Sequence, residues 1–318
     1  MKVSVSIITY NHEKFIGQAL DSVLMQDVNF EYELVIGEDC STDNTRKILL
    51  EYQDKHPAKI RLLLPENNQG VIRNFVQTYK SCKGEYIATL DGDDYWTSPN
   101  KLQSQAEFLD RHPDFSTCFH PVRVFYDDDK SKPGFPYPRE SKEISTLEDL
   151  LIYNFIPTCG VMFRNNLFGC FPEWFYTLGM EDWPLHVLNA QYGKIGYIDH
   201  VMADYRIHSS SVWSSKNLIY RTMEGIKFYK CIDSHLNYKY HRIINLVLSK
   251  HYYNLAMLYN DNGENKIARE YSVRSFLMDP GGRDIPIKNK LKQILQMYNP
   301  YLYDLFRKVK HGVINGKL

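Results

Sequence analysis

The feature that most constrains the fold is a repeated alternation of short apolar runs and amphipathic segments in the first part of the chain. β-rich runs cover residues 3–8, 32–36, 60–64 and 86–90, and helical patterns lie between them. Such an alternation predicts an α/β fold built on a doubly wound, mostly parallel sheet. Ligands of these sheets bind beyond the carboxyl ends of the strands. The residues at those ends are therefore the first candidates for a functional site.

Three of the expected strand ends carry polar or acidic residues that would meet at one crevice. They are Thr9, Tyr10 and Asn11 after the first run, Glu38 and Asp39 after the second, and residues 91–94 (DGDD) after the fourth. The last of these places three carboxylates around Gly92, which would let the backbone approach a ligand closely. Because like charges repel, a divalent cation is expected among them, and Mg²⁺ or Mn²⁺ would also bridge to phosphate oxygens. An acidic turn that caps the following helix is the alternative.

Several motifs together resemble family 2 glycosyltransferases with the GT-A fold. They are VSIITYNHEKFIGQALDSVLMQ near the N-terminus, Glu38-Asp39 followed by Ser41-Thr42-Asp43, and LDGDD. The resemblance covers about residues 1 to 210. It implies a Rossmann-like GT-A domain, and the order of the expected elements places the end of that domain at about residue 215. The pattern of residues 216–318 is almost wholly helical and predicts a helical C-terminal region, which the resemblance leaves unexplained. The implied activity is inverting transfer of a sugar from a nucleoside-diphosphate sugar, with UDP expected, to an acceptor hydroxyl. Bacterial surface glycan assembly, on a glycan or lipid-linked glycan acceptor, is the implied context.

The resemblance also implies roles for individual residues. Tyr10 would lie against the base, Asp39 would accept a hydrogen bond from a uracil-type ring nitrogen, and Asp91 would face the ribose. Asp93 and His208, in YRIHS, would bind the metal, and the nitrogen ligand favours Mn²⁺ over Mg²⁺. The remaining residues expected at the nucleotide are Thr9, Asn11, Glu13, Arg73 and Gly92. The alternatives are a turn role for Asp39 ahead of the second helix, a surface role for His208, and a phosphate contact by Arg206.

The motif Gly179-Met180-Glu181-Asp182-Trp183 resembles the acidic motif that carries the family's general base. Inverting transfer needs a base beside the acceptor hydroxyl. Asp182 is the expected base, and Glu181 is the second choice, with a role in holding the donor sugar or the acceptor. Helix capping by Asp182 is the alternative. Trp183 is expected either beneath a sugar ring or in the core.

Three further segments carry expectations. A polar, Pro-rich loop over residues 127–141 is a candidate mobile flap over a substrate. Residues 253–280 resemble a single tetratricopeptide-type helical hairpin, as a cap on the catalytic domain or as a peptide-binding element. Residues 283–318 carry eight basic and two acidic residues, a net of 8 − 2 = +6, beside apolar stripes. This tail predicts peripheral contact with an anionic membrane, with a solvated helix face as the alternative.

Composition narrows the class of protein. Lys plus Arg and Asp plus Glu number 38 each, so no bulk charge would recruit nucleic acid. The six cysteines are scattered, which is typical of free thiols in a reducing compartment. With no signal-like N-terminus and no span-length apolar stretch, we expect a cytoplasmic protein, at the inner face of the membrane if the tail binds there. A sugar nucleotidyltransferase and a non-catalytic helical scaffold are the rival functions, although a nucleotidyltransferase would need a Gly-rich phosphate loop after the first strand.

Overall fold

A computed structural model describes residues 1–211, 213, 215–299, 301 and 303 of the chain. The chain divides into two compact units, Met1–Ser215 and Lys216–Leu318. Each unit is described by itself below.

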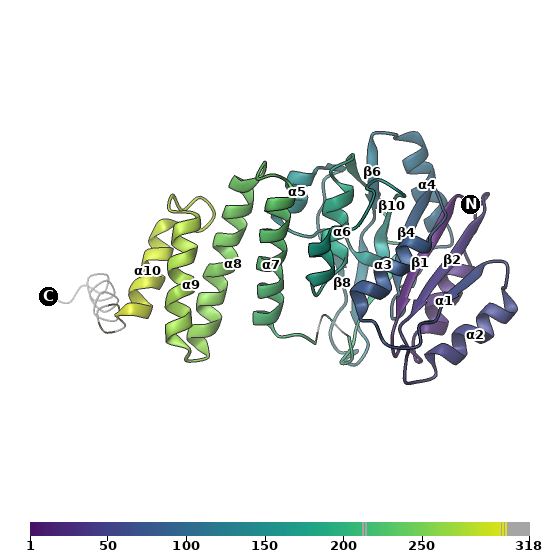
Figure 1. Cartoon of the computed structure of the whole chain (residues 1–318), viewed down its shortest axis with the longest axis horizontal. Helices are drawn as coiled ribbons and strands as arrows, with labels where there is room; N and C mark the ends of the chain where they lie inside the picture. Colours follow the sequence, from purple (N-terminus) through teal and green to yellow (C-terminus); the bar gives the residue numbers. More distant parts are fainter. Residues whose placement is uncertain (212, 214, 300, 302, 304–318) are drawn as a thin grey trace. The chain divides into compact units, whose positions relative to one another are not determined.

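The first unit is built on an eight-stranded sheet (Figure 1). Its parallel part has the order β3 (Ile60–Leu63), β2 (Tyr32–Glu38), β1 (Val3–Thr9) and β4 (Tyr86–Asp91). The sheet continues with β10 (Val161–Arg164), β6 (Phe115–Phe119), β11 (Lys194–Tyr197) and β9 (Ile144–Ser145). β10 runs antiparallel to both β4 and β6, whereas β11 is parallel to β6. The mostly parallel α/β sheet predicted from the sequence is therefore confirmed.

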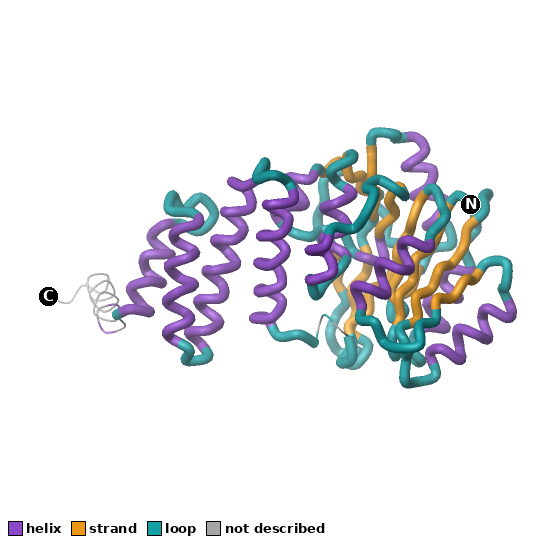
Figure 2. The backbone as a smooth tube through the Cα atoms, in the orientation of Figure 1, coloured by secondary structure: helices purple, strands orange, loops and turns teal. Residues whose placement is uncertain are grey.

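Helices cover both faces of this sheet, and Figure 2 shows them in front of and behind the strands. Successive side chains of a strand point to opposite faces of its sheet, so both faces of β1 need cover. On one face, Val3, Val5 and Ile7 enter the core that α1 (Ile16–Leu24) and α4 (Lys101–Arg111) share. On the other face, α3 (Val71–Ser81) packs against β1 and β2. The remaining helices of the unit are α2 (Thr45–Lys55), α5 (Leu147–Ile152), α6 (Asp182–Asn189) and two short 3₁₀ helices, Thr158–Gly160 and Glu173–Thr177. Helices on two faces are the pattern of a doubly wound fold.

A second, smaller sheet has the order β5 (Tyr95–Trp96), β12 (Ala203–Ile207), β7 (Val122–Tyr126) and β8 (Phe135–Tyr137). The consecutive strands β6 and β7 belong to different sheets, β6 to the large one and β7 to the small one. Pro121, which has no N–H to donate, lies at the break between β6 and β7. The expected flap also differs, because β8 lies within it and pairs antiparallel with β7. That part of the loop is thus tied to the sheet.

The described part of the second unit is helical (Figure 1). Its helices are α7 (Leu218–His235), α8 (His241–Asp261), α9 (Asn265–Met278) and α10 (Ile287–Tyr298), and each packs against the next. The predicted hairpin corresponds to the second half of α8 with α9, joined through Gly263 at a φ of 81°. That positive φ explains the glycine. The sequence pattern missed that a further helix packs on each side of the hairpin. None of the helices that the structure describes is long and apolar enough to cross a bilayer.

One basic residue of the C-terminal tail proves to be buried. Lys290 is 1% exposed, and its Nζ lies 2.9 Å from Oδ2 of the buried Asp279. Lys290 therefore adds no charge to a surface, which corrects the count made from the sequence. Four other basic residues of the tail, Arg307, Lys308, Lys310 and Lys317, lie outside the described residues. Membrane contact through residues 283–318 stays a prediction.

Candidate active site

The carboxyl ends of β1, β2 and β4 lie next to one another, as the strand pattern predicted. Thr9 pairs with Glu38 across β1 and β2, and Ile8 pairs with Asp91 across β1 and β4. The parallel register therefore brings the three candidate strand ends to one edge of the sheet.

The loop after β1 is fixed by hydrogen bonds to the start of α2. Asn11 has a φ of 56°, which Asn tolerates better than most residues, and its Oδ1 accepts from the backbone N–H of Thr42 at 2.8 Å. Glu13 Oε2 accepts from both the backbone N–H and the side chain of Asn44. Asn11 and Glu13 thus hold the loop, whereas Tyr10 is 39% exposed and free to meet a ligand.

Asp39 is buried and supports a different helix from the one considered in the sequence. Its two carboxylate oxygens accept the backbone N–H groups of Gln69 and Gly70, at 2.7 and 2.9 Å, just ahead of α3. The residue at the start of α2 is instead Asp43, which accepts from the N–H of Thr45. Each carboxylate oxygen can accept more than one hydrogen bond, so Asp39 could accept a further one from a nucleotide base, and that role stays a prediction. Arg73 lies exposed in the first turn of α3.

Gly92 is required by the packing around it. A Cβ atom there would lie 2.6 Å from Thr9 Oγ1 and 2.9 Å from His12 Nδ1. The chain after β4 can therefore approach the end of β1 only because this residue has no side chain. This close approach places the acidic turn against the β1 loop.

The three carboxylates of the acidic turn have different surroundings. Asp94 is 2% exposed, and its Oδ1 accepts the backbone N–H of Arg206, so it anchors β12. Asp93 Oδ2 lies 3.0 Å from His208 Nε2 and 3.7 Å from His12 Nε2. Burial would raise the pKa of Asp93, but the hydrogen bond to His208 and the charges of His12 and His208 hold it below its ordinary value. For Asp91, burial and the charge of Glu181 raise the pKa well above the ordinary value.

Asp93 and His208 suit a divalent metal. Ligands about 2.1 Å from an ion, on neighbouring corners of an octahedron, are about 3.0 Å apart. The observed 3.0 Å between Asp93 Oδ2 and His208 Nε2 meets that requirement. Within the described residues, no three His, Cys, Asp or Glu side chains form a complete metal-binding group. An ion held here would need further ligands from outside the protein.

Arg206 has a structural role in this site. Its guanidinium donates to the Asp93 backbone carbonyl at 2.8 Å, to Asp127 at 2.5 Å and to Gln18 at 2.6 Å. Because it is 7% exposed and each of its three nitrogen atoms donates a hydrogen bond, it holds the strand end that carries His208. This arrangement speaks against the phosphate contact considered from the sequence.

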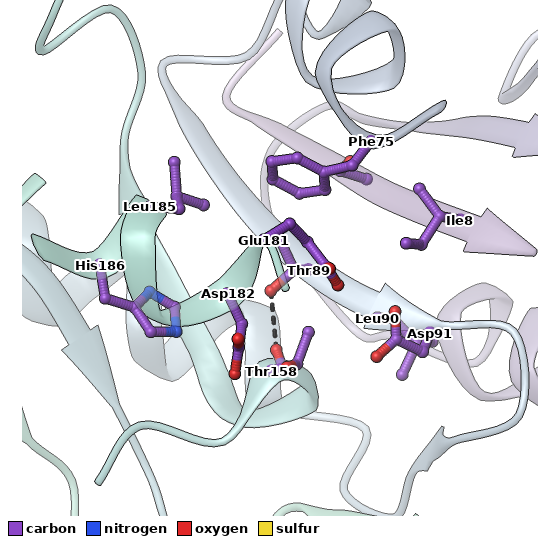
Figure 3. A pocket seen from close by; sticks show the side chains of 11 residues that line it. Ile8, Phe75, Thr89, Leu90, Asp91, Thr158, Glu181, Asp182, Leu185 and His186 are labelled. Carbon is purple, nitrogen blue, oxygen red and sulfur yellow. Dashed lines mark hydrogen bonds between the residues drawn. The ribbon is translucent and has the colours of Figure 1, made fainter. Parts of the chain in front are cut away.

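A small cavity brings three carboxylates together on the α3 face of the sheet (Figure 3). Asp91, Glu181 and Asp182 line it, with Phe75 from α3 among the walls, and its volume of about 10 Å³ is room for about one water molecule. Burial and then the charge of Asp182 raise the pKa of Glu181 to about 8. Burial also raises the pKa of Asp182, the first residue of α6.

Sequence reasoning missed three residues around these groups. His12 lies beside Asp93, as described above. Asn154 donates from its Nδ2 to Asp182 Oδ2 at 3.0 Å. His186, one turn after Asp182, lines the cavity, and neither ring nitrogen has a hydrogen-bond partner in the part of the chain that the structure describes. Only the i to i+4 spacing of Asp182 and His186 could have suggested a link. Trp183 is half-buried, and its indole N–H donates to the Leu150 carbonyl at 3.0 Å, so a place beneath a sugar ring stays a prediction.

Comparison with known proteins gives the context for this site. An uncharacterized protein of Mycobacterium tuberculosis is 39% identical over 213 residues, which are 67% of this chain and 61% of that protein. The chain thus spans less than two thirds of the length of this relative. TuaG of Bacillus subtilis, named for a glycosyltransferase of teichuronic acid biosynthesis, is 31% identical over 72% of this chain and 92% of its own length.

Two solved structures share the fold. The complex of Staphylococcus aureus TarS residues 1–349 with UDP-GlcNAc has a TM-score of 0.57 at 23% identity, covering 93% of this chain and 81% of that one. The Pyrobaculum calidifontis mannosyltransferase PcManGT, in complex with GDP-Man and Mn²⁺, has a TM-score of 0.59 at 17% identity, covering 98% and 85%. At these identities the likeness establishes the GT-A fold alone.

The family model for glycosyl transferase family 2 matches residues 4–168, which include the β1 loop, Asp39 and the acidic turn. The nucleotidyltransferase and scaffold alternatives are set aside on this ground. The chain belongs to glycosyl transferase family 2.

Proposed function

We propose that this chain is a metal-dependent, inverting glycosyltransferase that moves a sugar from a UDP-sugar to an acceptor hydroxyl. One observation carries the proposal: the Asp93–His208 pair lies at the same strand end as the cavity of Asp91, Glu181 and Asp182. A cation-binding pair beside half-buried carboxylates of raised pKa is what a site needs to bind a diphosphate and to accept a proton.

The nucleotide is proposed to lie over the ends of β1, β2 and β4. Tyr10, 39% exposed, would stack on the base, and Asp39 would accept from a uracil ring N–H. Asp91 would meet the ribose, and Arg73 would add positive charge at the exposed start of α3. The rest of this nucleotide surface would be formed by Thr9, Asn11, Glu13 and Gly92. Support for UDP comes from TarS, whose structure contains UDP-GlcNAc, while PcManGT contains GDP-Man with Mn²⁺.

Asp93 and His208 would hold the metal, for which we propose Mn²⁺ or Mg²⁺. When bound, the ion would neutralise charge on the diphosphate leaving group. Arg206 would keep the two ligands aligned, since it binds the Asp93 backbone and lies two residues before His208. These contacts add to the hydrogen bond from the Arg206 backbone N–H to Asp94 Oδ1, which also ties β12 to the acidic turn.

Asp182 is the proposed base. With a pKa of about 8, Glu181 carries a proton at neutral pH, which leaves Asp182 as the carboxylate able to accept one. Asn154 would orient it through the 3.0 Å hydrogen bond to Oδ2. The acceptor's hydroxyl oxygen would attack the anomeric carbon from the side opposite the diphosphate, which leaves. The proton of that hydroxyl would pass to the free carboxylate oxygen of Asp182. Glu181, as a neutral acid, would donate a hydrogen bond to a sugar hydroxyl.

The acceptor is proposed to be a glycan or lipid-linked glycan of a bacterial surface. Support comes from the names of TuaG and TarS, one for teichuronic acid biosynthesis and the other for a poly(ribitol-phosphate) N-acetylglucosaminyltransferase. Peripheral membrane contact through residues 283–318 would bring the enzyme to a lipid-linked acceptor.

The test uses a panel of UDP- and GDP-sugars with Mn²⁺, measuring thermal shift, donor hydrolysis and transfer. We expect one UDP-sugar to stabilise the wild type, and EDTA to remove that shift. Asp93→Ala should lose both the shift and turnover, whereas Asp182→Asn should keep the shift and lose roughly 10²-fold or more in turnover. Asp27→Asn, an exposed aspartate away from the site, is the matched control.

Two results would count against the assignment. Full turnover by a folded Asp182→Asn variant would remove Asp182 as the base and favour Glu181. A donor shift that survives both EDTA and Asp93→Ala would remove the metal from the proposal.

A further inference from the structure

A groove of about 480 Å³ lies in the first unit, around β8. Its walls come from β8, from the residues that follow it, and from Tyr153 at the end of α5. Three aromatic side chains line it, namely Phe135, Tyr137 and Tyr153. Such a combination of open volume and aromatic walls is typical of a ligand site.

Asn154 joins this groove to Asp182. The Tyr137 hydroxyl donates to the backbone carbonyl of Asn154, and the Asn154 side chain donates to Asp182 Oδ2 at 3.0 Å. Burial and then the charge of Asp182 raise the pKa of Tyr137 to about 12. A wall of the groove and the proposed base therefore share one residue as a common hydrogen-bonding partner.

The groove has the chemistry of a carbohydrate site. Tyr153 is 52% exposed, so a flat aromatic face is available to pack against the C–H face of a sugar ring. Arg139 also lines the groove and is exposed, and no carboxylate in the described ranges forms an ion pair with it. Its N–H donors are therefore available to the oxygen atoms of a ligand.

We infer that this groove binds the acceptor glycan and directs its hydroxyl toward Asp182. The inference rests on the proposed function and adds the place of the second substrate. The proposed nucleotide surface is formed by other elements, the ends of β1, β2 and β4, so the groove is free while the donor is bound. Its occupant is a saccharide chain, with stacking on Tyr153 as the main contact.

The experiment measures binding of the full chain to an array of bacterial glycans, in the presence of UDP and Mn²⁺. Tyr153→Ala removes the exposed ring, and Tyr153→Phe keeps it. Tyr192→Ala is the matched control, because Tyr192 is 55% exposed, close to the 52% of Tyr153, and does not line the groove. Thermal shift by the UDP-sugar is recorded for each variant.

We expect Tyr153→Ala to weaken glycan binding about tenfold, the size of a lost aromatic contact of about 1.4 kcal/mol. Tyr153→Phe and Tyr192→Ala should bind glycans as the wild type does, and all variants should keep the donor shift. Glycan binding by Tyr153→Ala equal to that of the wild type, or no wild-type binding to any glycan, would overturn the inference while the donor shift remains. If the UDP-sugar gave no thermal shift with the wild type, the proposed function would be refuted instead.

Discussion

Replacing Gly92 by alanine tests the close contact between the acidic turn and the β1 loop. The new Cβ would lie 2.6 Å from Thr9 Oγ1, 2.8 Å from Thr9 Cβ and 2.9 Å from His12 Nδ1. Three contacts this short cannot be relieved by turning one flexible side chain, so the turn and the loop must move apart. Overpacking of this kind costs about 1–3 kcal/mol.

The expected effect is measurable by scanning calorimetry. For a domain of 150–250 residues, 1 kcal/mol corresponds to roughly 2–4 °C, so Tm should fall by about 2–12 °C. Since His12 lies 3.7 Å from Asp93, the stabilisation by UDP-sugar with Mn²⁺ should also decrease. Gly169→Ala is the control, because a Cβ there would meet no atom within 4 Å. If Gly92→Ala matched this control in both Tm and donor stabilisation, the packing argument would be refuted.

Two further predictions concern ionisable side chains. The pKa of Glu181 rises from 4.5 to about 8 on folding, so between these values the folded chain keeps a proton that the unfolded chain releases, and stability falls as pH rises. Glu181→Gln should therefore stabilise the protein more at pH 8 than at pH 5. Urea unfolding measures this, and an equal difference in free energy of unfolding between variant and wild type at both pH values would contradict it. Lys290→Met removes the buried partner of Asp279, which keeps only the longer ion pair with exposed Arg283, and should cost about 3 kcal/mol, most of it regained in Lys290→Met/Asp279→Leu. Exposed Lys288→Met is the control, and a single variant as stable as this control would disprove the pairing argument.

The sequence predicted the α/β fold because strand and helix periods alternate clearly in its first part. Strand ends could also be placed, since parallel strands with short connections bring their carboxyl ends to one edge. On that basis the neighbourhood of Thr9, Asp39 and Asp91 follows from pattern alone. The antiparallel direction of β10 could not be predicted, because a short apolar run such as residues 161–164 carries no signal of direction.

The supporting residues of the site were harder to find. His12 and Asn154 act through contacts between elements that are far apart in the chain, and neither belongs to a periodic pattern. In the sequence, nothing distinguishes His186 from other residues of a short helix, and only the cavity that it lines indicates a role. The burial of Lys290 was hidden for the same reason, since a lysine among other basic residues resembles a solvated surface. Pairwise tertiary contacts, and not local propensity, decide these cases.

The two proposed metal ligands come from different sheets. Asp93 follows β4 of the large sheet, and His208 follows β12 of the small one, 115 positions later in the chain. A fragment ending at residue 168, where the family match stops, would contain Asp93 without His208, Asp182 or the guanidinium that fastens the two strand ends. Manganese affinity would then serve as a probe of complete assembly, because a partly folded chain can present one ligand but cannot present both.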